Sequence, residues 1–157
     1  MKQTKLKTFA VVSACMMGML SSSAQGVMQR TANYHPDGRG FSCVNGNYRY
    51  TRALYGSVDE WRLETSDRPI FAIFKKNNHR NIRFVIKCNG QAFQLDSVEY
   101  CKARYEAGKR EYLMKDKRWG SGVLKLSVLA YPQTEGAGWK FAAENFGKAK
   151  IEIVGMI

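Results

Sequence analysis

Hydrophobic and polar residues alternate most regularly between Gly122 and Tyr131. The apolar positions recur at every second residue, at Leu124, Leu126, Val128 and Ala130. A period of two is typical of a β-strand that buries one face in a sheet. Pro132 ends the pattern, because proline has no N–H to donate to a neighbouring strand. We therefore predict a half-buried strand here, and expect the chain beyond residue 40 to supply its partners.

Short segments with strand-like patterns follow one another along the chain. They cover residues 41–44, 48–52, 61–65, 70–74, 82–87, 91–95, 98–106, 110–114, 122–131, 139–143 and 150–153. About ten short strands with no clear helix have the spacing of a β-sandwich or a β-barrel. The fold class that we expect is all-β, an antiparallel β-sandwich.

Two Asn-Gly pairs predict how some of these strands connect. Asn45-Gly46 and Asn89-Gly90 are strong hairpin signals, because both residue types tolerate positive φ. They predict hairpins that join 41–44 to 48–52 and 82–87 to 91–95.

Other connections follow from glycine, proline and polar residues. Gly108, between tyrosine-rich segments, favours a hairpin over a helix across residues 98–114. Residues 66–69 are expected to form a turn and the polar residues 75–81 a loop. Residues 53–60 are expected to connect two strands.

The first 24 residues have the pattern of a signal peptide. Three lysines precede an apolar run over residues 9–20, which is too short to span a bilayer stably, and small residues at 22–24 suit a cleavage site. A membrane anchor is the alternative. A second alternative is a lipoprotein cleavage pattern over Val12–Cys15, which would attach the protein to a membrane through Cys15.

We favour simple export to the periplasm or cell surface. Removal of residues 1–24 leaves one domain over residues 25–157, large enough to fold around its own core. Residues 25–33 are polar and lack periodicity, so we expect an exposed arm.

The charge is strongly basic. The chain has 25 Lys and Arg against 13 Asp and Glu, a net charge of +12. A basic surface favours polyanionic partners. Export makes acidic polysaccharide, lipopolysaccharide phosphate or anionic lipid better candidates than nucleic acid. The basic residues are spread along the chain, so a solvated surface that only aids solubility is the alternative.

Three cysteines remain beyond the signal peptide: Cys43, Cys88 and Cys101. In an oxidising compartment two of them could form a disulfide, and the sequence does not choose the pair. Burial of each as a small apolar residue is an equal alternative. There is no CxxC motif, and His35 and His79 are the only histidines, so we expect no metal and no cofactor.

Tryptophan supplies the best candidate for ligand binding. Trp61 and Trp139 fall on the apolar faces of their strands and are expected in the core. Trp119 lies in a predicted loop beside Asp116 and Arg118, where an indole could stack on a sugar ring while its neighbours bind hydroxyls. A structural role for Trp119 is an equal alternative.

Nothing in the sequence identifies catalytic residues. Glycoside hydrolysis needs two carboxylates held roughly 5–10 Å apart, and the spacing of Asp and Glu picks out no such pair. A small glycosidase that uses loop carboxylates such as Asp116 and Glu135 remains an alternative function.

Three stretches carry a resemblance to a known family. They are Asn33–Phe41 with Cys43–Gly46, Thr51–Gly56, and Arg118–Ala130. Together they resemble a bacterial family of domains of unknown function. Its members are found near the N-terminus of large exported proteins of polysaccharide utilisation systems, before regions similar to (α/α)-barrel glycosidases. The resemblance covers most of residues 33–146 and implies a β-sandwich that packs against a catalytic barrel.

The chain ends at Ile157, where the barrel would begin, so no activity is carried over to its residues. Our hypothesis is an exported, non-catalytic module of a carbohydrate-processing system that scaffolds or contacts glycan. It would be a truncated front domain of a larger glycoside hydrolase or a stand-alone module, with a polysaccharide, acidic or neutral, or a glycosidase domain as partner. Besides the small glycosidase, the alternative is a basic envelope protein that binds anionic surfaces or a partner protein.

Overall fold

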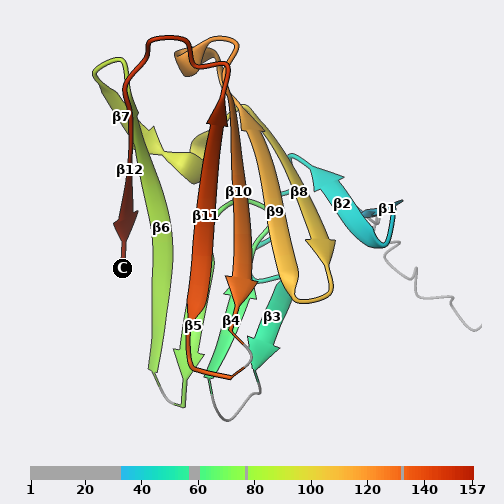
Figure 1. The fold of residues 1–157 in the computed structure, drawn as a ribbon. Coiled ribbons are helices and arrows are strands. Elements are labelled where there is room, and N and C mark those ends of the chain that lie inside the picture. Colours follow the sequence, from blue (N-terminus) through green and yellow to red (C-terminus); the bar gives the residue numbers. More distant parts are fainter. Residues whose placement is uncertain (1–32, 57–60, 77, 132) are drawn as a thin grey trace, which may run out of the picture. The chain divides into compact units, whose positions relative to one another are not determined.

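The computed structural model describes residues 33–157 except 57–60, 77 and 132. The predicted signal peptide, the predicted lipidation at Cys15 and nearly all of the predicted arm lie outside the described residues. Within them the chain forms twelve β-strands, two short 3-10 helices and no α-helix (Figure 1), which confirms the all-β prediction. None of the helices in this part is long and apolar enough to span a membrane.

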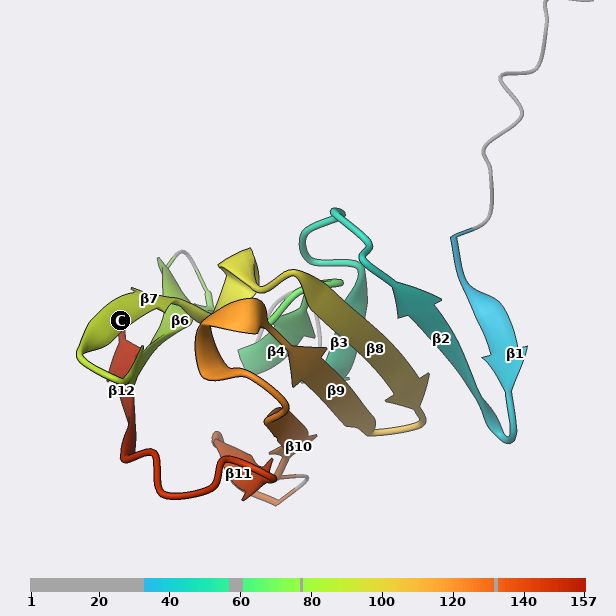
Figure 2. The same ribbon diagram turned by 90° about the horizontal axis from the view of Figure 1, so that it is seen from above.

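The strands form two antiparallel sheets that face each other in a sandwich-like arrangement (Figure 2). The first sheet has the order β1 (His35–Asp37), β2 (Gly40–Val44), β8 (Tyr100–Glu106), β9 (Lys109–Lys115), β10 (Val123–Ala130) and β11 (Ala137–Glu144). The second has the order β12 (Ile151–Met156), β6 (Asn78–Cys88), β5 (Phe71–Lys75), β4 (Trp61–Thr65) and β3 (Arg52–Gly56), and β7 (Gln91–Gln94) also pairs with β6.

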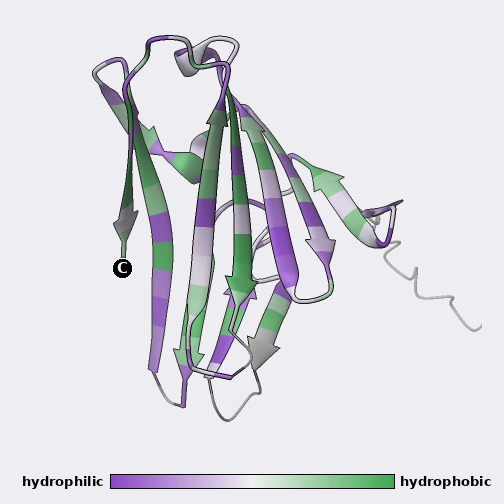
Figure 3. Cartoon of the chain, in the orientation of Figure 1, coloured by the Kyte–Doolittle hydropathy of each residue, from purple (hydrophilic) through white to green (hydrophobic). Residues whose placement is uncertain are grey.

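The predicted half-buried strand is confirmed as β10, which lies between β9 and β11 in the first sheet. Leu124, Leu126 and Val128 are fully buried between the sheets, whereas Lys125 and Leu129 point outward and are exposed. The same period of two places Tyr112 and Met114 of β9 against this strand on the inner face. Hydrophobic and hydrophilic bands accordingly alternate along the strands of this sheet (Figure 3).

One of the two Asn-Gly hairpins is confirmed and the other is wrong. Asn89 and Gly90 both have positive φ, 50° and 76°, and β6 pairs with β7 across them. Asn45 also has positive φ, 51°, but there the chain leaves the first sheet for the second. The Asn45 side chain accepts a hydrogen bond from the Cys101 N–H at 2.9 Å, and the Asn45 N–H donates to the Cys101 carbonyl at 2.8 Å. These bonds anchor Asn45 to β8 instead of closing a hairpin.

Two other connections differ from the prediction, and one agrees. Residues 53–56, expected in the connection over 53–60, belong to strand β3 (Arg52–Gly56). Most of the predicted loop 75–81 belongs to a hairpin, since Lys75 pairs with Asn78 and β6 continues from there. The main chain of residues 78–81 pairs with β5, although the side chains of all four residues are exposed. Exposed positions carry polar residues, and this run of polar residues led to the prediction of a loop. The hairpin predicted over 98–114 is confirmed by the pairing of β8 with β9.

A substitution at Gly40 tests how closely β2 packs against β8. A Cβ added at Gly40 would overlap the carbonyl oxygen of Tyr105, which is backbone and cannot move aside. We expect Gly40→Ala to lower the free energy of unfolding by roughly 1–3 kcal/mol in urea titrations, as overpacking does. The matched control is Gly155→Ala, where the new Cβ would meet the Phe84 ring at 3.4 Å, an ordinary contact. Equal stability of the two variants would contradict the packing described for β2.

Candidate functional site

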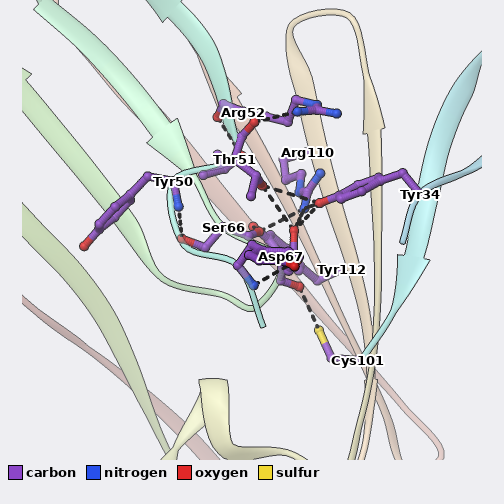
Figure 4. Close-up of polar contacts among 11 residues, drawn as sticks. Tyr34, Tyr50, Thr51, Arg52, Ser66, Asp67, Cys101, Arg110 and Tyr112 are labelled. Carbon is purple, nitrogen blue, oxygen red and sulfur yellow. Dashed lines mark hydrogen bonds and ion pairs between the residues drawn. The ribbon is translucent and has the colours of Figure 1, made fainter. Parts of the chain in front are cut away.

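A charged pair lies buried between the two sheets and organises the polar residues around it (Figure 4). Asp67 follows β4 in the second sheet, and Arg110 comes from β9 in the first. Both side chains are 0% exposed, and Arg110 Nη2 lies 3.6 Å from Asp67 Oδ1. We call these two residues, together with Tyr34, Thr51, Ser66 and Tyr112, the Asp67 cluster.

The carboxylate of Asp67 is fully engaged by hydrogen bonds. Its Oδ1 accepts from the Tyr34 hydroxyl and, at 3.1 Å, from Thr51 Oγ1. Its Oδ2 accepts from the Tyr48 N–H at 3.0 Å. A buried carboxylate needs such donors, because desolvation of an unpaired charge is costly.

The guanidinium of Arg110 completes the cluster. Its Nη2 donates to the Ser66 carbonyl at 2.9 Å and to the Tyr34 oxygen at 2.6 Å, and Tyr112 donates to the same Ser66 carbonyl at 2.7 Å. The guanidinium carbon also lies 5.5 Å from the ring centroids of Tyr34 and Tyr112, so both rings face the positive charge. Burial, followed by the hydrogen bond to Asp67, raises the pKa of Tyr34 to about 12, so its hydroxyl stays a donor at neutral pH.

The Asp67 cluster fixes the irregular segment between Asn45 and Thr51. The Asp67 N–H donates to the Tyr48 carbonyl at 2.9 Å, and the Tyr50 N–H donates to Ser66 Oγ at 2.9 Å. Gly46 lies so close to Asp67 that a side chain there would overlap the carboxylate. Tyr50 is held at a φ of 53°, a conformation that is strained for an aromatic residue and persists only where surrounding contacts impose it.

A small polar pocket of about 140 Å³ opens beside this segment. Its walls come from residues 47–49, from the turn after β4 and from the 3-10 helix η1 (Leu95–Ser97). The lining residues are Asn47, Tyr48, Arg49, Ser66, Arg68, Ile70 and Asp96. Arg68 Nη1 donates to the carbonyls of Asp96 and Val98 at 3.1 and 2.7 Å, which joins the turn to η1. We call this hollow the Asp96 pocket.

The structure brings the predicted binding residues Asp116 and Arg118 into direct contact. Asp116 caps the 3-10 helix η2 (Lys117–Trp119), and its two oxygens accept from Arg118 Nε and Nη2, both at 2.6 Å. Asp116 also accepts from the Glu99 N–H at 3.0 Å. The Arg118 hydrogen bonds hold the pKa of Asp116 at about 2, well below its usual range. This pair therefore ties η2 to the start of β8.

Trp119, the third predicted residue, packs in the core. It is 5% exposed, its ring lies against Phe93 and Phe146, and its Nε1 donates to the Gly122 carbonyl at 3.0 Å. Its indole faces are therefore covered by protein, which fits the structural alternative. The guanidinium of Arg118 lies 3.5 Å over Phe93 and donates to the Ser97 carbonyl at 3.3 Å, so it links η2 to η1.

The other tryptophans and the cysteines pack toward the interior. Trp61 is buried, and Trp139 packs against Phe71 and Phe84. Among the described residues, three buried cysteines are present as free thiols: Cys43, Cys88 and Cys101. Burial raises the pKa of Cys101 to about 12, which makes it a poor nucleophile. Within the same part of the chain no group of three or more His, Cys, Asp and Glu is placed to hold a metal ion.

A second hollow, of about 230 Å³, lies on the outer face of the first sheet. The outward side chains that line it are Lys102, Arg104, Glu111, Leu113, Lys125 and Ser127, from β8, β9 and β10. Leu113 pairs with Lys102 on one side and Lys125 on the other, and Glu111 with Arg104 and Ser127. An apolar residue is thus flanked by charged and hydroxyl side chains. We call this the outer-face hollow.

The charged residues of the outer-face hollow take part in exposed ion pairs. Lys102 Nζ lies 2.9 Å from Asp37, and Lys125 Nζ lies 2.7 Å from Glu144. Arg104 contacts Glu111 at 3.2 Å. The side chains of Lys102 and Lys125 are 38% and 45% exposed, so solvent screens these pairs and each contributes little to stability.

Sequence reasoning missed the Asp67 cluster and the Asp96 pocket. One signal for the cluster was available: Arg110 occupies an inward position in the alternation that also buries Tyr112 and Met114. A charged residue at such a position needs a buried partner. Nothing in the sequence identifies Asp67 as that partner, because the two are brought together only by the packing of the sheets.

Residues 78–154 match the model of a family described as a domain of unknown function (DUF4450). This segment contains Arg110, Asp96, the Asp116–Trp119 segment and the outer-face hollow, whereas Tyr34 and Asp67 precede it. No curated protein and no solved structure matches the chain.

A double-mutant cycle tests the charged pair of the Asp67 cluster. We expect Asp67→Asn and Arg110→Met each to lower the free energy of unfolding by roughly 3–5 kcal/mol, because each leaves a buried charge without its partner. The double variant should lose at least about 1 kcal/mol less than the sum. The control cycle, Lys125→Met with Glu144→Gln, removes an exposed pair and should show coupling under about 1 kcal/mol. Additive losses at Asp67 and Arg110 would contradict the pairing.

The lowered pKa of Asp116 predicts acid-dependent stability. A carboxyl whose folded pKa is depressed stabilises the fold above its unfolded pKa, about 4, and loses that contribution as the pH falls toward 2. We expect Asp116→Asn to be less stable than the wild type at pH 5, and the difference in free energy of unfolding to shrink progressively toward pH 2. A difference that stays constant over this range, measured by urea titration at each pH, would show that Asp116 is not tightly bound by Arg118.

Proposed function

We propose that this chain is an exported, non-catalytic module of a carbohydrate-processing system that contacts glycan through the outer-face hollow. The observation that carries the proposal is the composition of that hollow. Leu113 offers an apolar surface between Lys102 and Lys125, and Glu111 and Ser127 offer hydrogen-bonding groups beside it. A sugar ring has the matching character, with apolar C–H faces and hydroxyl groups at its edge. The volume of about 230 Å³ suits a single ring, since pockets for larger ligands have roughly 300–1,000 Å³.

The charge of the module supports an acidic glycan as the ligand. The net charge of the full chain is +12, and removal of residues 1–24, which hold three lysines and no acidic residue, would leave +9. Such a charge attracts polyanions over a distance set by the ionic strength. Lys102 and Lys125 hold Asp37 and Glu144 only through exposed ion pairs. A sugar carboxylate could replace either acidic partner at little cost, because exposed pairs contribute only about 0–1 kcal/mol.

The wider context is part of the same proposal. The basic, apolar and small-residue pattern of residues 1–24 supports export. The stretches Asn33–Phe41 with Cys43–Gly46, Thr51–Gly56 and Arg118–Ala130 resemble a family of domains found in glycosidase-like proteins. This resemblance supports membership of a glycosidase-like system. In such a system a catalytic domain would be the protein partner of this module.

Affinity electrophoresis in gels that contain an acidic polysaccharide, such as polygalacturonate, tests this function. We expect the wild-type chain to be retarded, and the double variant Lys102→Ala/Lys125→Ala to bind roughly tenfold more weakly through loss of two charges at the contact. The matched control, Lys87→Ala/Lys148→Ala, makes the same change in net charge away from the outer-face hollow and should bind almost normally.

Two outcomes would refute the proposed contact face. One is equal weakening in both double variants, which would indicate attraction by net charge alone. The other is a wild-type chain that migrates the same way in gels with and without polysaccharide, for polygalacturonate and for a panel of neutral and acidic glycans.

A further inference from the structure

The Asp96 pocket is built from different residues than the outer-face hollow and has a different chemical character. Asp96 lines it, and the Asp96 Oδ1 atom is buried without a hydrogen-bond partner among the described residues. A buried acceptor without a donor is costly, so a ligand group that donates to it is favoured. Rotation about χ2 of an aspartate is soft, so this oxygen can turn toward a donor that enters the pocket.

Side chains that can donate hydrogen bonds line the same pocket. Arg68 lines the pocket, and its guanidinium is fixed there because Nη1 donates to the main-chain carbonyls of Asp96 and Val98. Arg49 and Asn47 line the same hollow. A ligand group must therefore donate to Asp96 and accept from an arginine beside it. A hydroxyl does both, whereas a phosphate or a carboxylate only accepts and an ammonium group only donates.

The size of the pocket and the exposed residue at its edge restrict the kinds of ligand that fit. A volume of about 140 Å³ admits part of a ring rather than a chain of sugars. Tyr48 lines the pocket and is 62% exposed, so its ring can pack against the apolar face of a sugar. We infer that the Asp96 pocket is a second binding site, which takes a hydroxyl group of a terminal sugar residue. The inference rests on the proposed function and adds a site that binds the terminal sugar of a glycan chain.

The Asp67 cluster prepares this site before a ligand arrives. Asp67 binds both the N–H and the carbonyl of Tyr48, and Ser66 Oγ accepts from the N–H of Tyr50. The main chain of one pocket wall is thus fixed by buried groups, and the strained φ of Tyr50 is part of the same arrangement. A preformed wall lowers the entropy that binding must overcome.

Titration of the purified chain with monosaccharides tests the inference. The probes are the methyl glycosides of glucose, galactose, mannose and rhamnose, followed by amide NMR shifts, with glycine as a zwitterionic probe. We expect at least one glycoside to bind with a Kd of roughly 1–10 mM, which is typical of a small weak ligand. Asp96→Ala should weaken it at least tenfold and Tyr48→Ala several-fold. Raising the salt concentration should have little effect, because the ligand is uncharged.

Asp96→Asn is the variant to test for glycoside binding if Asp96→Ala does not fold. It keeps the shape of the side chain and should still weaken binding several-fold, because the charged acceptor is lost. Unchanged affinity in a folded Asp96 variant, or absence of binding by all four glycosides, would overturn the inference. Binding of glycine in preference to the glycosides would also overturn it, in favour of a zwitterion site.

The double variant Lys102→Ala/Lys125→Ala separates this inference from the proposed function. It should bind the glycosides normally while it loses acidic polysaccharide. Glycoside binding that disappears in this variant would place the sugar in the outer-face hollow and overturn the assignment to the Asp96 pocket. Polysaccharide binding without any glycoside binding would refute the pocket alone, and the reverse result would refute the outer-face hollow alone.

Discussion

The buried pair of Asp67 and Arg110 is the constraint on which the irregular parts of this structure depend. Taking two charges out of water costs several kcal/mol per ion, so the fold must surround them with hydrogen bonds. Asp67 receives hydrogen bonds from Tyr34, Thr51 and the Tyr48 N–H, and Arg110 Nη2 donates to Tyr34 and to the Ser66 carbonyl. Nε and Nη1 of Arg110 have no partner among the described residues, so the carboxylate is better satisfied than the guanidinium. The packing of the sheets and the path of the chain from Asn45 to Thr51 are therefore coupled through one carboxylate.

The residues that stabilise the interior differ from those that are available at the surface for binding. Trp119, the tryptophan that was the best candidate for binding from the sequence, is buried in the core, as is Trp61. The surface carries charged and uncharged polar side chains and a few exposed apolar ones. Two hollows lie among them, the outer-face hollow around Leu113 and the Asp96 pocket. Both combine hydrogen-bonding groups with an apolar surface, which is the character that a sugar ligand requires.

The regularly alternating strands and two of the tight turns could be predicted from the sequence. Periods of two identify β10 and its neighbours, and the turns at Asn89-Gly90 and Gly108 depend only on local backbone preference. The turn at Asn45 could not be predicted, because Asn45 bonds to Cys101, a residue far along the chain. The prediction of a loop over 75–81 was wrong for another reason. The pairing of β5 with β6 extends over residues whose side chains are exposed, so no alternation of hydrophobic and polar residues indicates a strand there.

The candidate sites show the same division between local and long-range information. Asp116 and Arg118 are close in sequence, so their contact could be anticipated. The burial of Trp119 could not, because it is made by Phe93 and Phe146 from distant segments. The meeting of Asp67 with Arg110 and of Arg68 with Asp96 likewise depends on tertiary packing alone.

The most direct test of the account is a map of backbone amide shifts by NMR as a short acidic oligosaccharide is added. We expect two groups of shifted amides. One lies over residues 102–104, 111–113 and 125–127 around the outer-face hollow, and the other over residues 47–49, 68 and 96 around the Asp96 pocket. Shifts confined to other faces of the sandwich, or no shifts at saturating concentration, would contradict the claim that this module contacts glycan through these two sites.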